Sequence, residues 1–500
     1  MSTPTHTPTP TPTPQSTSSA ELTGAAKLEE VTRLMSKLTT DLQEINLLPH
    51  QRDAHLDQLK VYGRDPTNAD PIFTKEASRN FPPAGIETLT RHAFNSPSQA
   101  TSRNALRCLA NAMLLKADTR QTFVDLEYMS KACNKLKFDS WEDEFLVSRI
   151  VFLTTYDTNI DIEKLIDEDH LAESICSNIN RHAKQFGPKP KKPKEPMEDM
   201  ALNETLKLLF NVTHFCAQRS GAFSQALLPI LVILSRWPIP TPRPLDPPIS
   251  PLINALINLD FESKESVSTL FPKSTPNIYV DRLLDLLDQA TKTYTDDELE
   301  HSVSPLVTLL RKLYEVAPDD TKEQMRKSIL PSSVDRQKPL GRAETLASRL
   351  LRLATNPATP QLRECTSSLQ FDMSDKDART FVQNVGYGFA AGFLFGHNVP
   401  IPENALEAWS TSGGETSGAT ASQESRGLEG KVNLITGQFL DMEEKVEINM
   451  TEEEKEREAE RLFVLFERLK KTGVMNVQNP VQTALQEGRF EELPDDADSD

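Results

Sequence analysis

The sequence is poor in glycine, in cysteine and in long apolar runs, and it has no excess of basic residues. Its 500 residues include only 18 glycines, fewer than the ~7% that is usual in soluble proteins. Scarce glycine disfavours α/β enzymes built on glycine turns. It favours helices, because glycine costs roughly 1 kcal/mol per interior helix position relative to alanine. Leucine, by contrast, occurs 60 times.

The charge balance and the cysteines exclude further classes of protein. With 55 basic and 73 acidic residues the net charge is −18, so we expect no nucleic-acid partner. The longest apolar run, residues 226–234, contains a proline and is far shorter than the roughly 20 residues of a membrane span, so we expect no transmembrane segment. Five scattered cysteines without a C-x-x-C pair predict buried free thiols in a reducing compartment.

Catalytic motifs are also missing from the sequence. The nine histidines form no H-E-x-x-H, and there is no G-x-S-x-G nucleophile elbow. Residues 386–391 (GYGFAA) formally match the dinucleotide fingerprint, but no alternation of strands and helices surrounds them. We interpret their small residues as allowing either close packing of helices or a tight turn into a helix that carries Phe393 and Phe395. We expect no catalytic residue, no metal and no cofactor, and therefore a protein that is not an enzyme.

Changes of composition divide the chain into five parts. Residues 1–22 are rich in threonine and proline and should be disordered. A helical array should occupy residues 23–400, interrupted by proline-rich insertions at residues 187–196 and 237–251. Residues 401–430, rich in serine, threonine and glycine, predict a flexible linker. Residues 431–490 predict a C-terminal helical segment, and residues 491–500 form an acidic tail.

A helical signature recurs within the array: a polar residue, two aliphatic residues, a variable position, and often asparagine or leucine. It begins at residues 107, 149, 207, 254, 308 and 349, at intervals of 42, 58, 47, 54 and 41. Armadillo and HEAT repeats recur about every 40–47 residues, and insertions account for the two longer intervals. The sequence therefore predicts an all-α fold, an armadillo/HEAT-like right-handed α-solenoid with a flexible C-terminal linker and an amphipathic helix.

A solenoid of this kind encloses a concave groove, because single helix pairs cannot bury their apolar faces and must stack. Asn111 and Asn211 occupy the same position of the signature. An asparagine amide both donates and accepts hydrogen bonds, which suits the capture of a peptide backbone. Equally, these side chains could satisfy main-chain groups at loops or helix ends within the solenoid. The sequence leaves both interpretations open.

Residues 451–471 predict the amphipathic helix. They open with a capping box, TEEE, and end with two lysines that complement the helix dipole. Their apolar stripe consists of Ala459, Leu462, Phe463, Phe466 and Leu469. This helix could dock on the solenoid or bind a partner. Ser412, in the linker and followed by two glycines and a glutamate, is a candidate phosphorylation site for an acid-directed kinase.

Six segments in this order resemble the synembryn family, cytosolic exchange factors and chaperones for heterotrimeric G-protein alpha subunits. They are 102–111 (SRNALRCLAN), 148–156 (SRIVFLTTY), 204–213 (ETLKLLFNVT), 385–392 (VGYGFAAG), 432–437 (VNLITG) and 450–459 (MTEEEKEREA). The resemblance covers the chain from about residue 100 to 490. The N-terminus and the insertion at 187–196 depart from the family pattern, as does Phe389, where the family usually has asparagine.

The resemblance implies that the groove holds the C-terminal helix of a G-protein alpha subunit, GDP-bound or nucleotide-free. The segment after the linker would contact the nucleotide-binding domain near its switch region. A factor that binds the nucleotide-free state more tightly lowers nucleotide affinity by the same free energy, so exchange needs no bond-making chemistry. We expect a cytoplasmic monomer, which reaches the cell cortex or the membrane through its partner.

The expected groove contacts are polar residues that interrupt the apolar signature helices. They are Arg107, Asn111, Arg149, Lys207, Asn211 and His214. Leu462, Phe463 and Phe466 are expected to make the second contact. The alternative function is that of a general α-solenoid scaffold or transport adaptor, which would bind peptides without nucleotide exchange.

Overall fold

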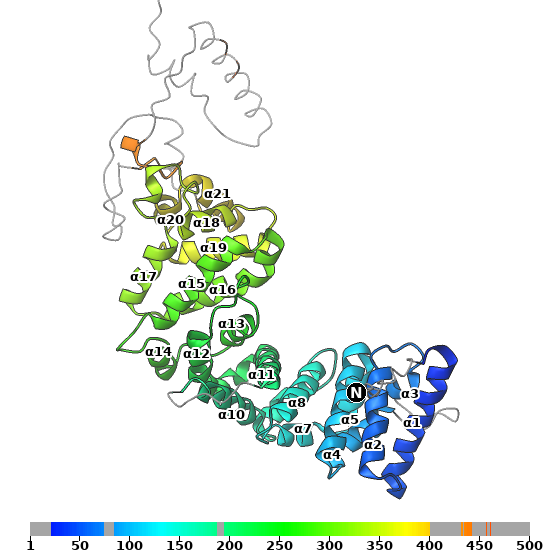
Figure 1. Cartoon of the computed structure of the whole chain (residues 1–500). Coiled ribbons are helices and arrows are strands. Elements are labelled where there is room, and N and C mark those ends of the chain that lie inside the picture. Colours follow the sequence, from blue (N-terminus) through cyan, green and yellow to red (C-terminus); the bar gives the residue numbers. More distant parts are fainter. Residues whose placement is uncertain are drawn as a thin grey trace, which may run out of the picture. The chain divides into compact units, whose positions relative to one another are not determined.

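The computed structural model describes residues 22–74, 85–187, 195–400, 432–433 and 435–442, with the single residues 457 and 461. Within these residues the fold is built from 21 α-helices (Figure 1). The one β-type pairing among them is an isolated antiparallel bridge between Val432 and Phe439. The predicted all-α solenoid is confirmed. The chain divides into two compact units, the first ending at Ala290 and the second beginning at Thr291.

The first unit contains fourteen complete α-helices and one long 3-10 segment among its described residues. They are α1 (Gly24–Glu44), α2 (Pro49–Tyr62), α3 (Asp70–Phe73), α4 (Gly85–Asn95), α5 (Gln99–Leu115), α6 (Asp118–Asp125), α7 (Met129–Lys135), α8 (Trp141–Thr154), α9 (Ile162–Asp167), α10 (Leu171–Lys184), α11 (Pro196–Phe215), η1 (Ala217–Ala226), α12 (Leu227–Arg236), α13 (Ile249–Ile257) and α14 (Lys264–Leu270). The division falls within α15 (Ile278–Thr293).

The helices begin where the sequence supplies caps. The hydroxyls of Ser98 and Ser140 accept hydrogen bonds, both 3.3 Å long, from first-turn amides of α5 and α8. Acidic residues fill the first turn of α8, where they favour the positive end of the helix dipole. In α1 the predicted apolar stripe, which includes Val31 and Leu38, is buried.

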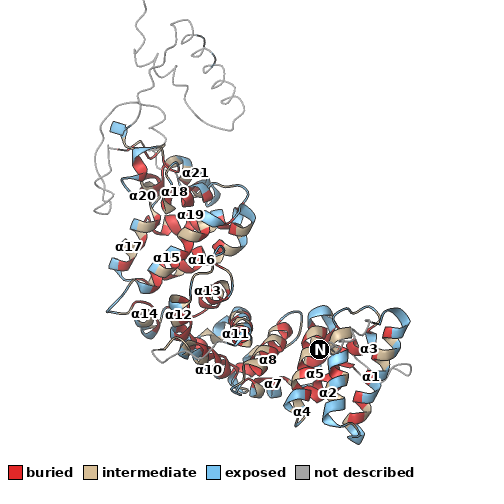
Figure 2. Cartoon of the chain, viewed as in Figure 1, coloured by how far each residue is buried: buried red, intermediate tan, exposed pale blue. Residues whose placement is uncertain are grey.

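The signature helices pack against one another in sequence order. α5 contacts α8, α8 contacts α11, and α11 contacts α13. All six signatures begin within helices, the last two in the second unit. Buried residues follow the contacts between successive helices (Figure 2). Each signature helix is therefore covered by neighbours on more than one side, as a stacked array requires.

The first proline-rich interruption lies mostly outside the described residues, and the second is described in full. Residues 188–194 lie outside the described part of the chain, and α11 begins at Pro196, since proline fits the first turn of a helix. The second interruption ends earlier than expected, because α13 begins at Ile249 rather than after residue 251. Leu245 within it is buried, so this segment contributes to the core.

The second unit contains the remaining helices and the end of the described chain. They are α16 (Asp296–Val316), α17 (Asp319–Ile329), η2 (Asp335–Gln337), α18 (Leu346–Leu353), α19 (Pro360–Asp372), α20 (Ala378–Val385), α21 (Tyr387–Gly396) and η4 (Leu440–Met442). Its last helices share an apolar cluster that includes Leu340, Phe381, Val385 and Leu394. In the described parts of the chain we find no helix both long and apolar enough to span a membrane.

Gly386 forms the turn between α20 and α21, with a φ of 83°. This left-handed backbone is why glycine is needed here. The interpretation of residues 386–391 as a turn into a helix is confirmed, with Phe393 and Phe395 both in α21.

All five cysteines are unpaired, and four of them are buried. Burial raises the pKa of the Cys108, Cys133 and Cys176 thiols to about 12. These thiols are therefore protonated and unreactive at neutral pH. Cys365 is partly exposed, an exception to the prediction of buried thiols.

Candidate functional site

The six predicted contact residues lie on three helices that are neighbours in the first unit, α5, α8 and α11 (Figure 1). On each helix they follow spacings of three, four or seven residues, which place them on one face. α5 carries Arg107 and Asn111, α8 carries Arg149, and α11 carries Lys207, Asn211 and His214. The predicted contact residues therefore lie on helices that pack side by side, and side-chain contacts near these residues connect one helix to the next.

Between α5 and α8 the link is ionic. Nη2 of Arg107 donates to Glu142, and Nη1 donates to Oδ1 of Asn104 at 2.7 Å. The Arg107 side chain remains one-third exposed. Asn111, one turn further along α5, is partly exposed. This part of the face presents a guanidinium and an amide to solvent.

Between α8 and α11 two cations share one carboxylate. Nζ of Lys207 lies 3.0 Å from Oε1 of Glu204, and Nη1 of Arg149 lies 3.6 Å from the same oxygen. The guanidinium of Arg149 also lies over the ring of Phe145, 5.8 Å from its centroid. Glu204 is buried, whereas both cations are partly exposed. The pairing leaves one positive charge in excess at this point.

Asn211 is used within the solenoid. It is only 3% exposed. Its Nδ2 donates to Oγ1 of Thr155 at 2.8 Å, and its Oδ1 accepts from the hydroxyl of Tyr156 at 3.4 Å. Asn111 and Asn211 therefore differ in their surroundings although they share a position in the signature. The part of either residue in binding a partner stays a prediction.

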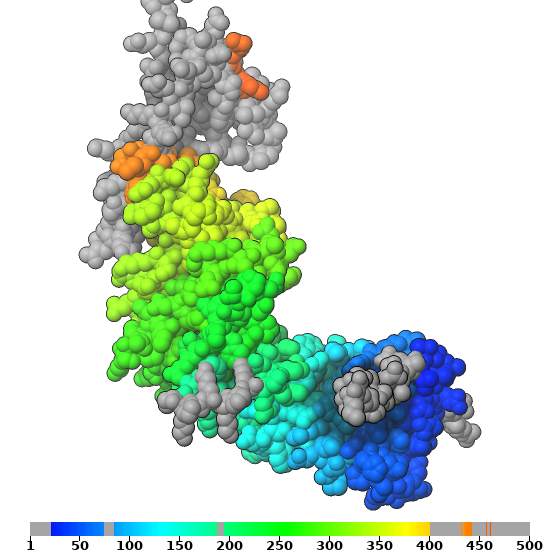
Figure 3. Space-filling view, in the orientation of Figure 1, coloured from blue at the N-terminus to red at the C-terminus, as the bar shows by residue number. Residues whose placement is uncertain are grey.

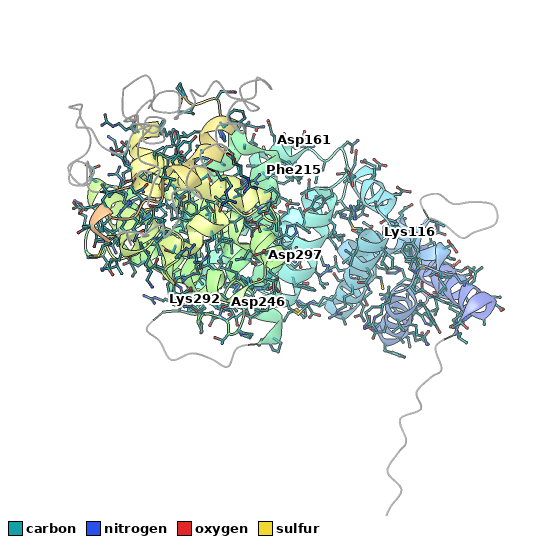
Figure 4. The ribbon with its side chains drawn as sticks, turned by 90° about the horizontal axis from the view of Figure 1, so that it is seen from above. Lys116, Asp161, Phe215, Asp246, Lys292 and Asp297 are labelled. Carbon is teal, nitrogen blue, oxygen red and sulfur yellow. The ribbon has the colours of Figure 1, made fainter. Side chains whose placement is uncertain are left out.

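Aromatic side chains gather where α8 and α11 end. His214 is exposed and stacks on Phe210, with ring centroids 5.9 Å apart and planes 9° apart. Phe215 meets both His214 and Tyr156 edge to face. It is 51% exposed, and Figure 4 labels it at the end of α11. Such a cluster offers apolar area and polar edges together.

We call these residues together the α5–α8–α11 surface. Its members are Arg107, Asn111, Arg149, Tyr156, Lys207, His214 and Phe215. Sequence reasoning missed Tyr156 and Phe215, and it missed Glu142 and Glu204, which hold the cations. Tyr156 lies two residues beyond the end of α8, so helical periodicity does not place it, whereas Phe215 directly follows His214 at the end of α11. The surface can bind a segment that carries acidic and apolar side chains.

A buried polar network underlies the first turn of α8. Glu144 is fully buried and accepts from Nε2 of His182 at 3.0 Å, from Oγ1 of Thr205 at 2.6 Å and from Arg181. Burial opposes the ionisation of Glu144, but these hydrogen bonds and the charges outweigh it and lower the pKa of its carboxyl. The network joins α8 to α10 and α11, and so it fixes the helices that carry the surface.

A polar cavity of about 1070 Å³ lies near the same network. Its lining includes Arg103, Lys135, Trp141, Asp143 and Arg181. Arg103 and Lys135 both pair with Asp143. Burial raises the pKa of that carboxyl, but the hydrogen bond from Arg103 and the positive charges outweigh it, and the net pKa is lowered. Asp143 is therefore ionised at neutral pH and engaged in ion pairs.

The other candidate residues cannot be placed. Leu462, Phe463, Phe466 and Ser412 lie outside the described residues, and their roles stay predictions. Within the described ranges no group of three or more histidine, cysteine or acidic side chains is arranged to hold a metal ion.

The fold defines the class: an all-α solenoid of stacked helices, with a cationic and aromatic surface on three successive helices. The family model described as guanine nucleotide exchange factor synembryn matches residues 55–489. This match covers most of the chain, and the chain belongs to the synembryn family. The resemblance drawn from the sequence motifs is confirmed.

Curated relatives agree with this assignment. The synembryn-like chaperone of Schizosaccharomyces pombe is 26% identical over 297 residues, which are 58% of this chain and 55% of that protein. The chain thus matches about half the length of the yeast relative. The chaperone Ric-8A of Gallus gallus is 23% identical over 521 residues, covering 94% of this chain and 92% of its own. The Xenopus tropicalis Ric-8A is 22% identical, with coverages of 94% and 90%.

Proposed function

We propose that this protein is a guanine nucleotide exchange factor and folding chaperone for heterotrimeric G-protein alpha subunits. The observation that carries the proposal is the synembryn family match over residues 55–489, which includes the whole α5–α8–α11 surface. The names of the curated relatives, all chaperones, support the second activity. The protein acts in the cytoplasm as a monomer and reaches the cell cortex through its partner.

The α5–α8–α11 surface receives the C-terminal helix of the alpha subunit. Arg107, Arg149 and Lys207 supply positive charge, and the rings at the ends of α8 and α11 supply apolar contact. A helix that ends in a carboxylate and carries apolar residues complements both. The charges on this surface are held by Glu142 and Glu204, so the surface is ordered before the partner arrives, which lowers the entropic cost of binding.

Exchange follows from a binding preference rather than from bond chemistry. A factor that holds the open, nucleotide-free alpha subunit more tightly than the GDP-bound form weakens GDP binding by the same free energy. GTP then binds and displaces the factor. The same preference shields an alpha subunit that has not yet acquired nucleotide, which is chaperone behaviour. Residues 431–490 make a second contact, near the switch region, and phosphorylation of Ser412 in the linker regulates it.

The test is the rate of GDP release from a panel of purified, GDP-loaded alpha subunits. We expect faster release from some of them, and loss of the effect when their C-terminal helix is deleted. Lys207→Ala should weaken the effect, whereas Lys264→Ala, at an exposed lysine of α14 in the same unit, should not. Peptide binding without any change in GDP release would favour the scaffold or transport adaptor instead.

A further inference from the structure

Residues 432–433 and 435–442, which we call the anchor segment, pack on the helices of the second unit after 31 residues that the structure does not describe. In Figures 1 and 3 they are the orange residues lying against the yellow-green helices. The main-chain N–H of Leu340 donates to the carbonyl of Thr436 at 3.0 Å, and that of Phe439 donates to the carbonyl of Arg336 at 2.9 Å. The anchor segment, whose described residues contain one short 3-10 helix and no α-helix, thus packs on residues about 100 positions earlier in the chain.

Arg336 is the main side-chain link to the anchor segment. It is 2% exposed. Its Nη1 donates to the carbonyl of Gly437 at 3.0 Å, and its Nη2 donates to the carbonyls of Gln383 and Asn384 at 3.2 and 2.8 Å. The last two carbonyls belong to the final turn of α20, where a helix favours a cation. Burial lowers the pKa of Arg336 to about 10, so the guanidinium is still charged at neutral pH.

Gly437 allows the anchor segment to pack closely against Leu340. Its φ is 69°, and an added Cβ would lie 2.2 Å from Cδ1 and 2.6 Å from Cγ of Leu340. Leu340 belongs to the apolar cluster of the second unit, so it has little room to move. Within the segment, N–H of Gly437 donates to the carbonyl of Asn433 at 2.7 Å, closing a tight turn. The seat therefore accepts one backbone conformation and one residue at this position.

We propose that the anchor segment fixes the position of Met442, after which the expected partner-binding residues continue to residue 490, and that Arg336 is thereby a positioning residue for their contact with the alpha subunit. This inference rests on the proposed function. Without the anchor, 50 residues separate residue 400 from residue 451; with it, eight separate Met442 from residue 451. For flexible tethers, effective concentration falls roughly as the −3/2 power of length, so anchoring raises it about 15-fold.

Paired insertions in the full-length chain test this inference. About ten glycine and serine residues are inserted either within residues 401–430 or within residues 443–450. In the native background the insertion before the anchor should leave GDP release unchanged, whereas the insertion after it should slow release about 3-fold by the same scaling. If the two insertions slow GDP release equally, the proposal is wrong, because the length of the chain before a fixed anchor segment does not change the position of the residues after it.

Two variants test the contact itself. Arg336→Gln and Gly437→Ala should each slow GDP release about 10-fold, while leaving unchanged the affinity for a peptide that reproduces the C-terminal helix of the alpha subunit. Hydrogen exchange should accelerate in peptides covering residues 334–342 and 435–442. Gly392→Ala is the matched control, because an added Cβ there meets nothing within 4 Å.

The outcomes separate the two proposals. If Gly437→Ala accelerates hydrogen exchange but leaves GDP release unchanged, the contact between the anchor segment and the helices is real, but it does not position the partner-binding residues. Unchanged hydrogen exchange in both variants would overturn the anchor. If the native protein does not accelerate GDP release from any alpha subunit, the proposed exchange function is wrong. Hydrogen exchange in the variants then still tests whether Arg336 and Gly437 stabilise the anchor segment.

Discussion

A buried charged side chain joins distant segments in each unit, but the two units do it differently. In the first unit, Glu144 receives hydrogen bonds from side chains on α10 and α11. In the second unit, Arg336 donates to main-chain carbonyls of α20 and of the anchor segment. The first link connects helices of one array, and the second connects the array to the anchor segment, whose described residues form no α-helix.

The difference lies in what each link depends on. The Glu144 link requires three particular partner side chains and an ionised carboxylate. The Arg336 link requires only the position of carbonyl oxygens, which any sequence supplies if the backbone takes the right path. The first unit is therefore sensitive to substitution of partner side chains and to acid. The anchor is sensitive to backbone geometry, above all at Gly437.

The largest effect should come from Glu144→Ala. Removing one partner of a buried ion pair typically costs about 3–5 kcal/mol. Here it removes the acceptor of His182 and Thr205, whereas Arg181 keeps its pair with Asp139. We expect the hydrogen exchange of α8, α10 and α11 to accelerate and that of the second unit to stay as it is. Glu323→Ala, which removes an exposed partner of Lys327, is the control and should cost under about 1 kcal/mol. Equal losses in both variants would contradict the comparison.

The two asparagines of the signature provide the next comparison. Asn211→Ala removes the buried hydrogen bond to Oγ1 of Thr155, which keeps only its own bond to the carbonyl of Phe152, and should cost about 1–3 kcal/mol of unfolding free energy. Asn111→Ala, at a partly exposed position, should change stability by under about 0.5 kcal/mol. Urea unfolding of both variants measures this. A larger loss of unfolding free energy in Asn111→Ala than in Asn211→Ala would show that burial does not determine the structural role of these two asparagines.

The helices could be predicted from the sequence because their periodicity is local. The apolar stripe of a helix such as α1 can be recognised from residues that are close in sequence. The spacing within the repeated signature likewise gives Arg149 and Lys207 the same position on their helices. The repeat spacing then sets which helices meet. The solenoid and the helix that carries Phe393 and Phe395 could be predicted in this way, whereas the predicted contact residues stay a prediction.

The partners across helices could not be predicted in the same way. Glu204 has a local partner in Lys207, three residues further along α11, but nothing in the sequence indicates that Arg149 of α8 also reaches it. Asn111 and Asn211 read alike in the sequence, and only the neighbour at the end of α8 separates them. The anchor segment carries no periodic pattern, so nothing local indicates that residue 437 meets Leu340, almost 100 residues earlier.

A smaller effect, on binding alone, is expected at the aromatic end of the surface. Phe215→Ala should weaken binding of a peptide taken from the C-terminus of the alpha subunit about 10-fold, the loss of one exposed aromatic contact, with little change in melting temperature. Phe138→Ala, at a more exposed phenylalanine elsewhere in the first unit, is the control. Calorimetric titration of both variants measures the difference, and equal affinities would remove Phe215 from the surface.

The smallest expected effect is the response to acid. The folded-state pKa of Glu144 lies below its ordinary value, so its stabilisation is complete above the unfolded pKa and is lost as pH falls through the folded pKa. Arg181 and His182, which face it, cannot replace the lost negative charge. Arg336 keeps its charge throughout this range. We therefore expect hydrogen exchange, measured between about pH 3 and pH 6 and corrected for its intrinsic pH dependence, to accelerate in α8 and α11 before it accelerates in residues 435–442. Asp335, beside the anchor segment, also has a lowered pKa. Earlier loosening of the anchor would mean that Asp335, rather than Arg336, governs its seat.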